Sequence, residues 1–154
     1  MLWTDYHHAA LQRLDDSRVL IDNGAYPGAI YFSGLAAESM IKAFIVSRDG
    51  EIKGHNFAKL AEAANLGRRL KVASRDEVNA AITEAAALWR NLFRYCSAGD
   101  LDRIGREWRI RFEVQNRMMN YADLGAIGPK LWAERLYNLA SLIVLEGDLL
   151  WQSK

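Results

Sequence analysis

The chain has 154 residues, about half of them hydrophobic, which is enough to bury one sizeable core and too few to expect two. We therefore expect one domain that spans residues 1–154. The formal net charge is +1, so the chain as a whole has no strong electrostatic preference for nucleic acid or membranes. Any such preference must come from a local surface.

The cysteine content and the apolar runs predict a cytoplasmic protein that does not contact a membrane. The one cysteine, Cys96, cannot form an internal disulfide, and no charged and then apolar leader precedes Trp3. The most apolar run, Leu139 to Trp151, is interrupted by Glu146 and Asp148 and is too short to span a bilayer of about 30 Å. No metal-ligand spacing or glycine-rich phosphate loop occurs, so we expect no metal and no cofactor.

Three helices are predicted in the first half of the chain from apolar periodicity and from capping and stop residues. The second is hydrophobic on nearly every side, which is typical of a helix at the centre of a core. Their bounds run from Thr4 or Asp5 to about Asn23, from about Tyr26 to Arg48, and through Leu60 to about Asn65 with a stop at Gly67.

A central helix is predicted from Asp76 to Ser97, behind a capping box of Ser74 and Glu77. Apolar residues recur in it at steps of three and four, which places them on one stripe: Val78, Ile82, Ala85, Trp89, Leu92 and Cys96. Arg90 and Arg94 would lie beside that stripe, one turn apart. Two such guanidinium groups form either a ledge that binds an anion or ion pairs with acids of neighbouring helices, such as Glu38 or Glu134.

The region from residue 101 to 122 fits two patterns. Ile104, Trp108 and Phe112 have helical spacing, whereas residues 109–114 alternate as a strand does, and we favour the helix. A loop at Gly125 and Gly128 then precedes a last helix from about Pro129 to Trp151. The predicted fold class is therefore all-α, an up-and-down helical bundle with an irregular insertion at about 101–128 before the last helix.

Basic and aromatic residues alternate through the insertion, as on a surface that stacks bases and neutralises phosphates. The solvent-exposed face of an amphipathic helix, or a dimer contact, would give the same pattern. The candidate phosphate-binding or nucleic-acid-binding residues are Arg90, Arg94, Arg106, Arg109 and Arg111.

The histidines are weaker candidates for chemistry. His7 and His8 are adjacent, so on a helix they point about 100° apart and do not easily share a metal. His55 follows a glycine and is interpreted as a helix-start residue rather than a base. Tyr95 and Cys96 are interpreted first as packing residues, because a buried thiol behaves as a small hydrophobic group.

Two segments, AIYFSGLAAESMIKAFIVS and GHNFAKLAEAANL, resemble the HEPN domain superfamily, and the resemblance extends from Tyr6 to about Leu66. In that family the second helix carries an Ala-Glu-x-x-x-Lys-Ala pattern, which is matched here by Ala37, Glu38, Lys42 and Ala43. A segment like His-x-Leu follows, which His55 and Phe57 match loosely. The resemblance implies the helical fold of this family.

Many HEPN domains are dimeric, metal-independent ribonucleases with an Arg-polar-x-x-x-(x)-His motif at the end of the third long helix. Arg90 and Asn91 match the first half of the motif, but Tyr95, Cys96 and Ser97 stand where the histidine would fall. Tyrosine, with an ordinary pKa of about 10, does not exchange protons near neutral pH as histidine does. The candidate catalytic residues are Arg90, Asn91 and Tyr95, and their role in catalysis is open.

The main functional hypothesis is a non-catalytic HEPN-like homodimer that binds RNA, a nucleotide or a partner protein. The resemblance alone implies a defence or toxin-antitoxin setting. One alternative is an active ribonuclease in which a residue outside the motif supplies the proton. Another is a structural scaffold that buries its aromatic-rich last helix and the Trp108 region against a partner chain.

Overall fold

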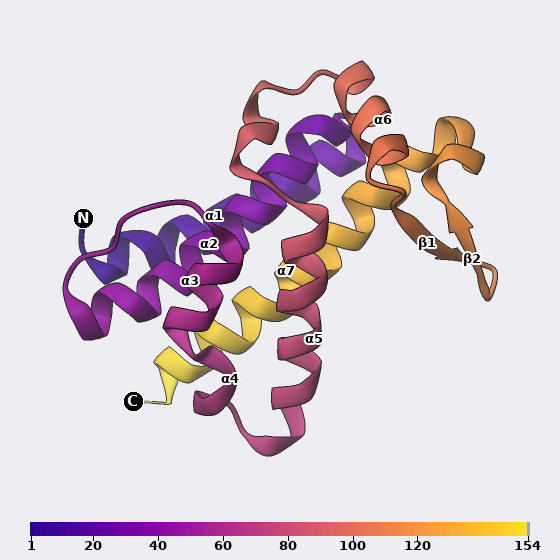
Figure 1. Cartoon of the computed structure of the whole chain (residues 1–154). Coiled ribbons are helices and arrows are strands. Elements are labelled where there is room, and N and C mark those ends of the chain that lie inside the picture. Colours follow the sequence, from indigo (N-terminus) through magenta and orange to yellow (C-terminus); the bar gives the residue numbers. More distant parts are fainter. Residues whose placement is uncertain (154) are drawn as a thin grey trace.

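The chain folds into a helical bundle around one buried helix, with a small hairpin at one end (Figure 1). A computed structural model describes residues 1–153, without the side chains of residues 67 and 72. Helix α2 (Tyr26–Asp49) packs against both α1 (Trp3–Asp22) and α7 (Gly128–Gln152). The predicted all-α bundle is confirmed.

Helix α2 is long and apolar enough to be compared with a membrane span. Its most apolar window has a mean hydropathy of 1.4, and 83% of that window is buried inside the protein. Burial by neighbouring helices accounts for the apolar sequence, as expected of a core helix. Small residues let α1 approach closely: the hydroxyl of Ser17 lies 2.6 Å from that of Ser33 and donates to the carbonyl of Ala29 at 3.0 Å.

The start of α1 differs from the prediction. Neither Thr4 nor Asp5 is the N-cap, because the helix begins at Trp3 behind Leu2. Asp5 instead accepts a hydrogen bond from the backbone amide of Leu2, at 2.7 Å. The carboxylate therefore satisfies an end amide from inside the first turn, where it also interacts favourably with the helix dipole.

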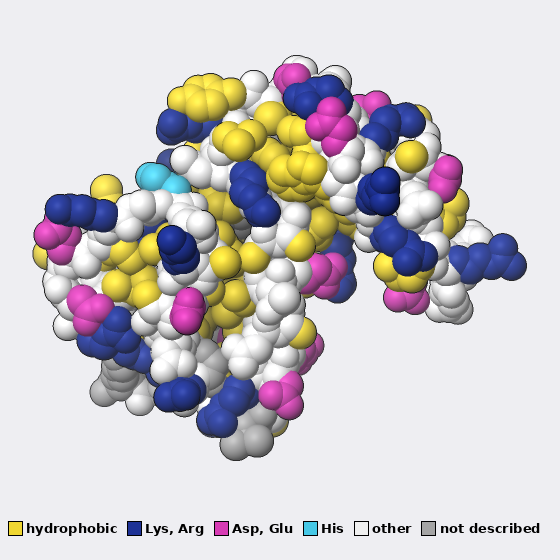
Figure 2. All heavy atoms as spheres, in the orientation of Figure 1, with side chains coloured by type: hydrophobic (Ala, Val, Ile, Leu, Met, Phe, Trp, Pro, Cys, Tyr) yellow, Lys and Arg dark blue, Asp and Glu magenta, His cyan; other side chains and the backbone are white. Residues whose placement is uncertain are grey.

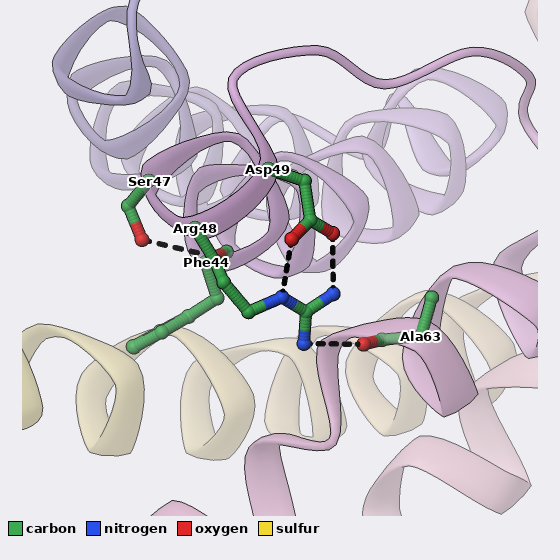
Figure 3. A network of polar contacts seen from close by, with 5 residues as sticks. All are labelled: Phe44, Ser47, Arg48, Asp49 and Ala63. Atoms are coloured by element: carbon green, nitrogen blue, oxygen red, sulfur yellow. Dashed lines mark hydrogen bonds and ion pairs between the residues drawn. The ribbon is translucent and has the colours of Figure 1, made fainter.

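The chain between α2 and α3 (Phe57–Ala64) is tied down at both ends. Arg48 makes two hydrogen bonds to the Asp49 carboxylate, at 2.5 and 2.6 Å, and a third to the carbonyl of Ala63 at 3.1 Å (Figure 3). The guanidinium of Arg48 holds the pKa of Asp49 below its ordinary range. Asn56 caps α3 by accepting from the amide of Lys59.

The predicted stop at Gly67 is wrong. Helix α3 already ends before Asn65, which adopts a left-handed conformation with φ of 51°. Asparagine tolerates this conformation better than most residues. The chain then turns directly into the short α4 (Leu66–Arg69), which includes position 67.

The predicted central helix is wrong at both ends. Helix α5 runs from Val72 to Leu88 behind Lys71, so Ser74 lies inside it and is not its cap. Trp89 and Arg90 are extended, and a 3-10 helix, η1 (Asn91–Tyr95), follows.

Side chains donate hydrogen bonds to the backbone carbonyls at the end of α5. These carbonyls would otherwise be satisfied by continuing the helix. The Trp132 indole donates to the carbonyl of Leu88 at 3.1 Å, and the Arg90 guanidinium donates to the carbonyls of Ala86 and Trp89. Helix-end carbonyls need such partners. As a result the stripe does not continue: Phe93 is buried and Leu92 is exposed.

The insertion contains both predicted structures in succession. Helix α6 (Ala98–Glu107) is followed by strands β1 (Arg111–Val114) and β2 (Arg117–Asn120), which pair antiparallel with Phe112 opposite Met119. The helix favoured for residues 101–122 is therefore wrong after Glu107, and the alternating pattern marked a real strand. The 3-10 turns η2 (Tyr121–Asp123) and η3 (Gly125–Ile127) lead into α7.

Candidate functional site

A buried carboxylate in the core helix is the starting point of the site. Glu38 is 1% exposed, and its Oε1 lies 2.6 Å from Nζ of Lys42, one turn further along α2. The same oxygen lies 2.8 Å from Nδ1 of His55, in the segment before α3. A buried charge is tolerated only with such partners, so Glu38, Lys42 and His55 form one polar cluster.

The geometry of this cluster favours one tautomer of His55. Lysine only donates hydrogen bonds and an ionised carboxylate only accepts them. Nδ1 therefore either donates to Glu38 or accepts from Lys42, whose Nζ is 3.3 Å away. The contact with Glu38 is shorter, and a charged acceptor strengthens the bond. In a neutral imidazole with its proton on Nδ1, Nε2 is left as an acceptor. The His55 side chain is about half exposed.

His55 and Arg90 line the same cavity. This cavity has a volume of about 500 Å³, and its other walls are Asn56, Phe57, Ala58, Ala86 and Trp89. On the histidine side, Arg48 at the end of α2 donates to the carbonyl of Ala63 in α3 (Figure 3), and Asn56, next to His55, caps α3. On the other side, Trp89 is buried against Gly34 of α2 and holds the neighbouring Arg90 at the rim.

Arg90 does not form the ion pairs considered from sequence. Glu38 binds Lys42 and His55, and Glu134 lies 3.8 Å from Lys130. The guanidinium group of Arg90 caps the end of α5 through one nitrogen and lies 5.1 Å from the centre of the Trp108 ring. Its Nε and its second terminal nitrogen make no hydrogen bond within the described part of the chain. They can therefore donate to an anion in the cavity.

Arg94 does not stack one turn above Arg90, because a 3-10 helix replaces the expected α-helical turn. Its guanidinium group lies 4.6 Å from the ring of Tyr95, and both side chains are exposed. Asn91 is half-buried at the start of η1. Of the candidate catalytic residues, only Arg90 lines the cavity that His55 also lines.

The other predicted basic residues lie apart from this cavity. Arg106 pairs with Asp102 at 3.0 Å, and together with Arg109 it lines a cavity of about 260 Å³ beside η2. Arg111 lines a separate cavity of about 470 Å³ beneath the hairpin. These three arginines therefore do not line the cavity that Arg90 and His55 share.

The two N-terminal histidines are outside the site. His7 bonds Asp148 of α7 at 2.7 Å, and His8 is exposed on α1. Within residues 1–153, no group of three or more His, Cys, Asp and Glu side chains is placed to hold a metal ion.

Cys96 should react slowly with iodoacetamide near neutral pH. Desolvation, and to a smaller extent the charge of Asp100, raise the pKa of its thiol, while Arg103 lowers it. A raised pKa leaves less of the reactive thiolate at pH 7.5. Alkylation followed by mass spectrometry should be slower in the native protein than in urea, and it should accelerate above pH 9. Equal alkylation rates in the native protein and in urea would contradict this prediction. Cys96→Ser, which has no thiol, is the negative control.

Sequence reasoning interpreted His55 as a helix-start residue, and it therefore missed the cluster with Glu38. The available signal was Glu38 itself, a carboxylate in a helix that is otherwise apolar on nearly every side. An acid in such a helix needs more than one polar partner when it is fully buried. The intrahelical Lys42 supplies one partner, so a second had to come from another segment.

A comparison with protein families finds that residues 4–103 match the family described as HEPN domain. The match includes α1 to α5, the polar cluster, Arg90 and most of α6. No curated protein and no solved structure matches the chain.

Proposed function

Because the chain belongs to the HEPN domain family, we propose that it is a metal-independent ribonuclease in which His55 transfers the proton. The observation that supports this proposal is the shared cavity. An imidazole with a free Nε2, oriented by a buried carboxylate, lines the same cavity as an arginine with unused donors. A base oriented by a third group is a recurring arrangement for activating hydroxyl groups.

In the proposed reaction, Nε2 of His55 removes the proton from a ribose 2′-hydroxyl. The 2′-oxygen then attacks the adjacent phosphorus, and the bond from phosphorus to the 5′-oxygen breaks. The protonated imidazole, stabilised by Glu38, returns its proton to that oxygen. Arg90 neutralises charge on the phosphoryl oxygens. The products are a 2′,3′-cyclic phosphate and a 5′-hydroxyl.

The test is incubation of the pure protein with RNA in EDTA. We expect fragments that end in cyclic phosphate, and Arg90→Ala should lower the cleavage rate about 10²-fold because a donor to the reacting phosphate is lost. Arg13→Ala is the matched control, because Arg13 also lies 5.1 Å from an aromatic ring, that of Phe32. It should cleave at the wild-type rate.

The result separates this proposal from a non-catalytic binding module. A preparation that binds RNA but releases no product would refute cleavage and favour binding alone. Binding alone has one observation in its favour. Among the described residues that line the cavity, only His55 is suited to act as a general acid or base, so the lining offers no second group to donate a proton.

We also propose the setting suggested by family membership, namely a cytoplasmic homodimer in a defence or toxin-antitoxin system. Light scattering of the purified chain tests the dimer. A mass of one chain, about 17.4 kDa, would exclude it under those conditions.

A further inference from the structure

The outer face of η1 presents two large apolar side chains to solvent. In a 3-10 helix, residues three apart lie directly above one another. Leu92 and Tyr95 have this spacing and are 55% and 76% exposed, whereas Phe93 between them is buried. Because Phe93 is buried in the core, it fixes the orientation of the 3-10 turn. The turn therefore holds Tyr95 in a position that points into solvent.

The segment of chain that forms this face carries basic residues and no acidic residue. The sequence has no Asp or Glu from residue 85 to 99, but it has Arg90 and Arg94. Neither arginine forms an ion pair within the described part of the chain, and each lies over an aromatic ring, Trp108 for Arg90 and Tyr95 for Arg94. Figure 2 shows hydrophobic side chains gathered over the region between η1 and α6, with both basic and acidic side chains around them.

We infer that Tyr95 stacks an unpaired base of an RNA strand whose backbone lies along Arg90 and Arg94. This inference rests on the proposed function, because Arg90 also borders the cavity that contains His55. The charge selects a polyanion, and an exposed aromatic face offers the stacking surface that single-stranded nucleic acid uses. A base inside a duplex is already stacked, so it cannot use that face.

Tyr95 therefore contributes to binding and to the choice of substrate, and its hydroxyl transfers no proton. Tyr95→Phe and Tyr95→Trp keep the ring and should bind single strands as the wild type does. Tyr95→Ala removes the ring and should weaken binding about tenfold, within the range measured for loss of one stacked base.

The experiment measures fluorescence anisotropy with a labelled 12-nucleotide 2′-O-methyl RNA, as a single strand and as a duplex. The blocked 2′-oxygen prevents the proposed cleavage, so binding is measured even if the protein is not a nuclease. We expect the single strand to bind more tightly than the duplex, and the affinity to fall as salt rises. Leu149→Ala, a change at another exposed apolar residue, on α7, should not alter binding.

Two outcomes would overturn the inference. One is equal affinity of the wild type and Tyr95→Ala for the single strand. The other is a change in oligomeric mass for Tyr95→Ala with unchanged RNA binding, which would assign the face to a protein contact. If the wild-type protein binds the single strand through Tyr95 but does not cleave RNA, the proposed function alone is refuted.

Discussion

Replacing His55 with alanine should lower the rate of RNA cleavage by about 10²- to 10⁴-fold, the usual contribution of one general acid or base. The variant should lose some stability, because Glu38 loses one of its two partners, but it should stay folded. The imidazole is about half exposed, so water can take its place beside Glu38, which keeps its contact with Lys42 at 2.6 Å. The measurement is the initial rate of cleavage in EDTA, with circular dichroism as the check on folding.

Two further results would assign the loss to the imidazole itself. His8→Ala removes an exposed histidine of α1 and should cleave at the wild-type rate. Imidazole added to the solution should restore part of the activity of His55→Ala, because it can diffuse into the open cavity and accept the same proton. An unchanged rate for His55→Ala would exclude His55 as the base.

The helices that pack by regular periodicity are the part of the fold that the sequence predicts well. Apolar positions in α1 and α7 recur at helical spacing, α2 is apolar on nearly every side, and the tertiary neighbours of all three agree with these patterns. The end of helix α5 at Leu88 could not be predicted from such spacing. Local periodicity continues through Trp89 and Leu92, and the side chain that binds the carbonyl of Leu88 comes from Trp132, 44 residues later.

The same distinction explains the candidate site. Arg90 could be found because its family motif is local. The cluster of Glu38 and His55 depends on the segment between two helices folding back over α2, and the fixed spacing of one helix says nothing about that segment. The expected position of Arg94, one α-helical turn after Arg90, was wrong for a related reason, since it required a helix that the tertiary structure ends.

Gly34→Ala should destabilise the protein by about 3 kcal/mol, the upper part of the usual range for overpacking. Gly34 lies in the middle of α2, directly against the indole ring of Trp89. A methyl group there would overlap that ring, and Trp89 is 1% exposed, so the buried ring would have to shift. Helix propensity alone predicts the opposite sign, because alanine is favoured over glycine by about 1 kcal/mol.

Gly28→Ala, in the same helix, is the matched control. Its methyl group would meet only the end of the Leu20 side chain, at 3.2 Å, and that end can move. We expect this variant to unfold at the wild-type urea concentration or slightly above it. A Gly34→Ala protein as stable as Gly28→Ala would show that Trp89 does not occupy the position described.

The double variant Gly34→Ala with Trp89→Phe tests the contact directly. The smaller ring leaves room for the methyl group, so the two changes should cost less together than the sum of their separate costs. The measurement is urea unfolding, followed by circular dichroism, of the wild type, Gly34→Ala, Trp89→Phe and the double variant. Because Trp89 also holds Arg90 at the rim of the cavity, Gly34→Ala should reduce cleavage even at temperatures where it is fully folded.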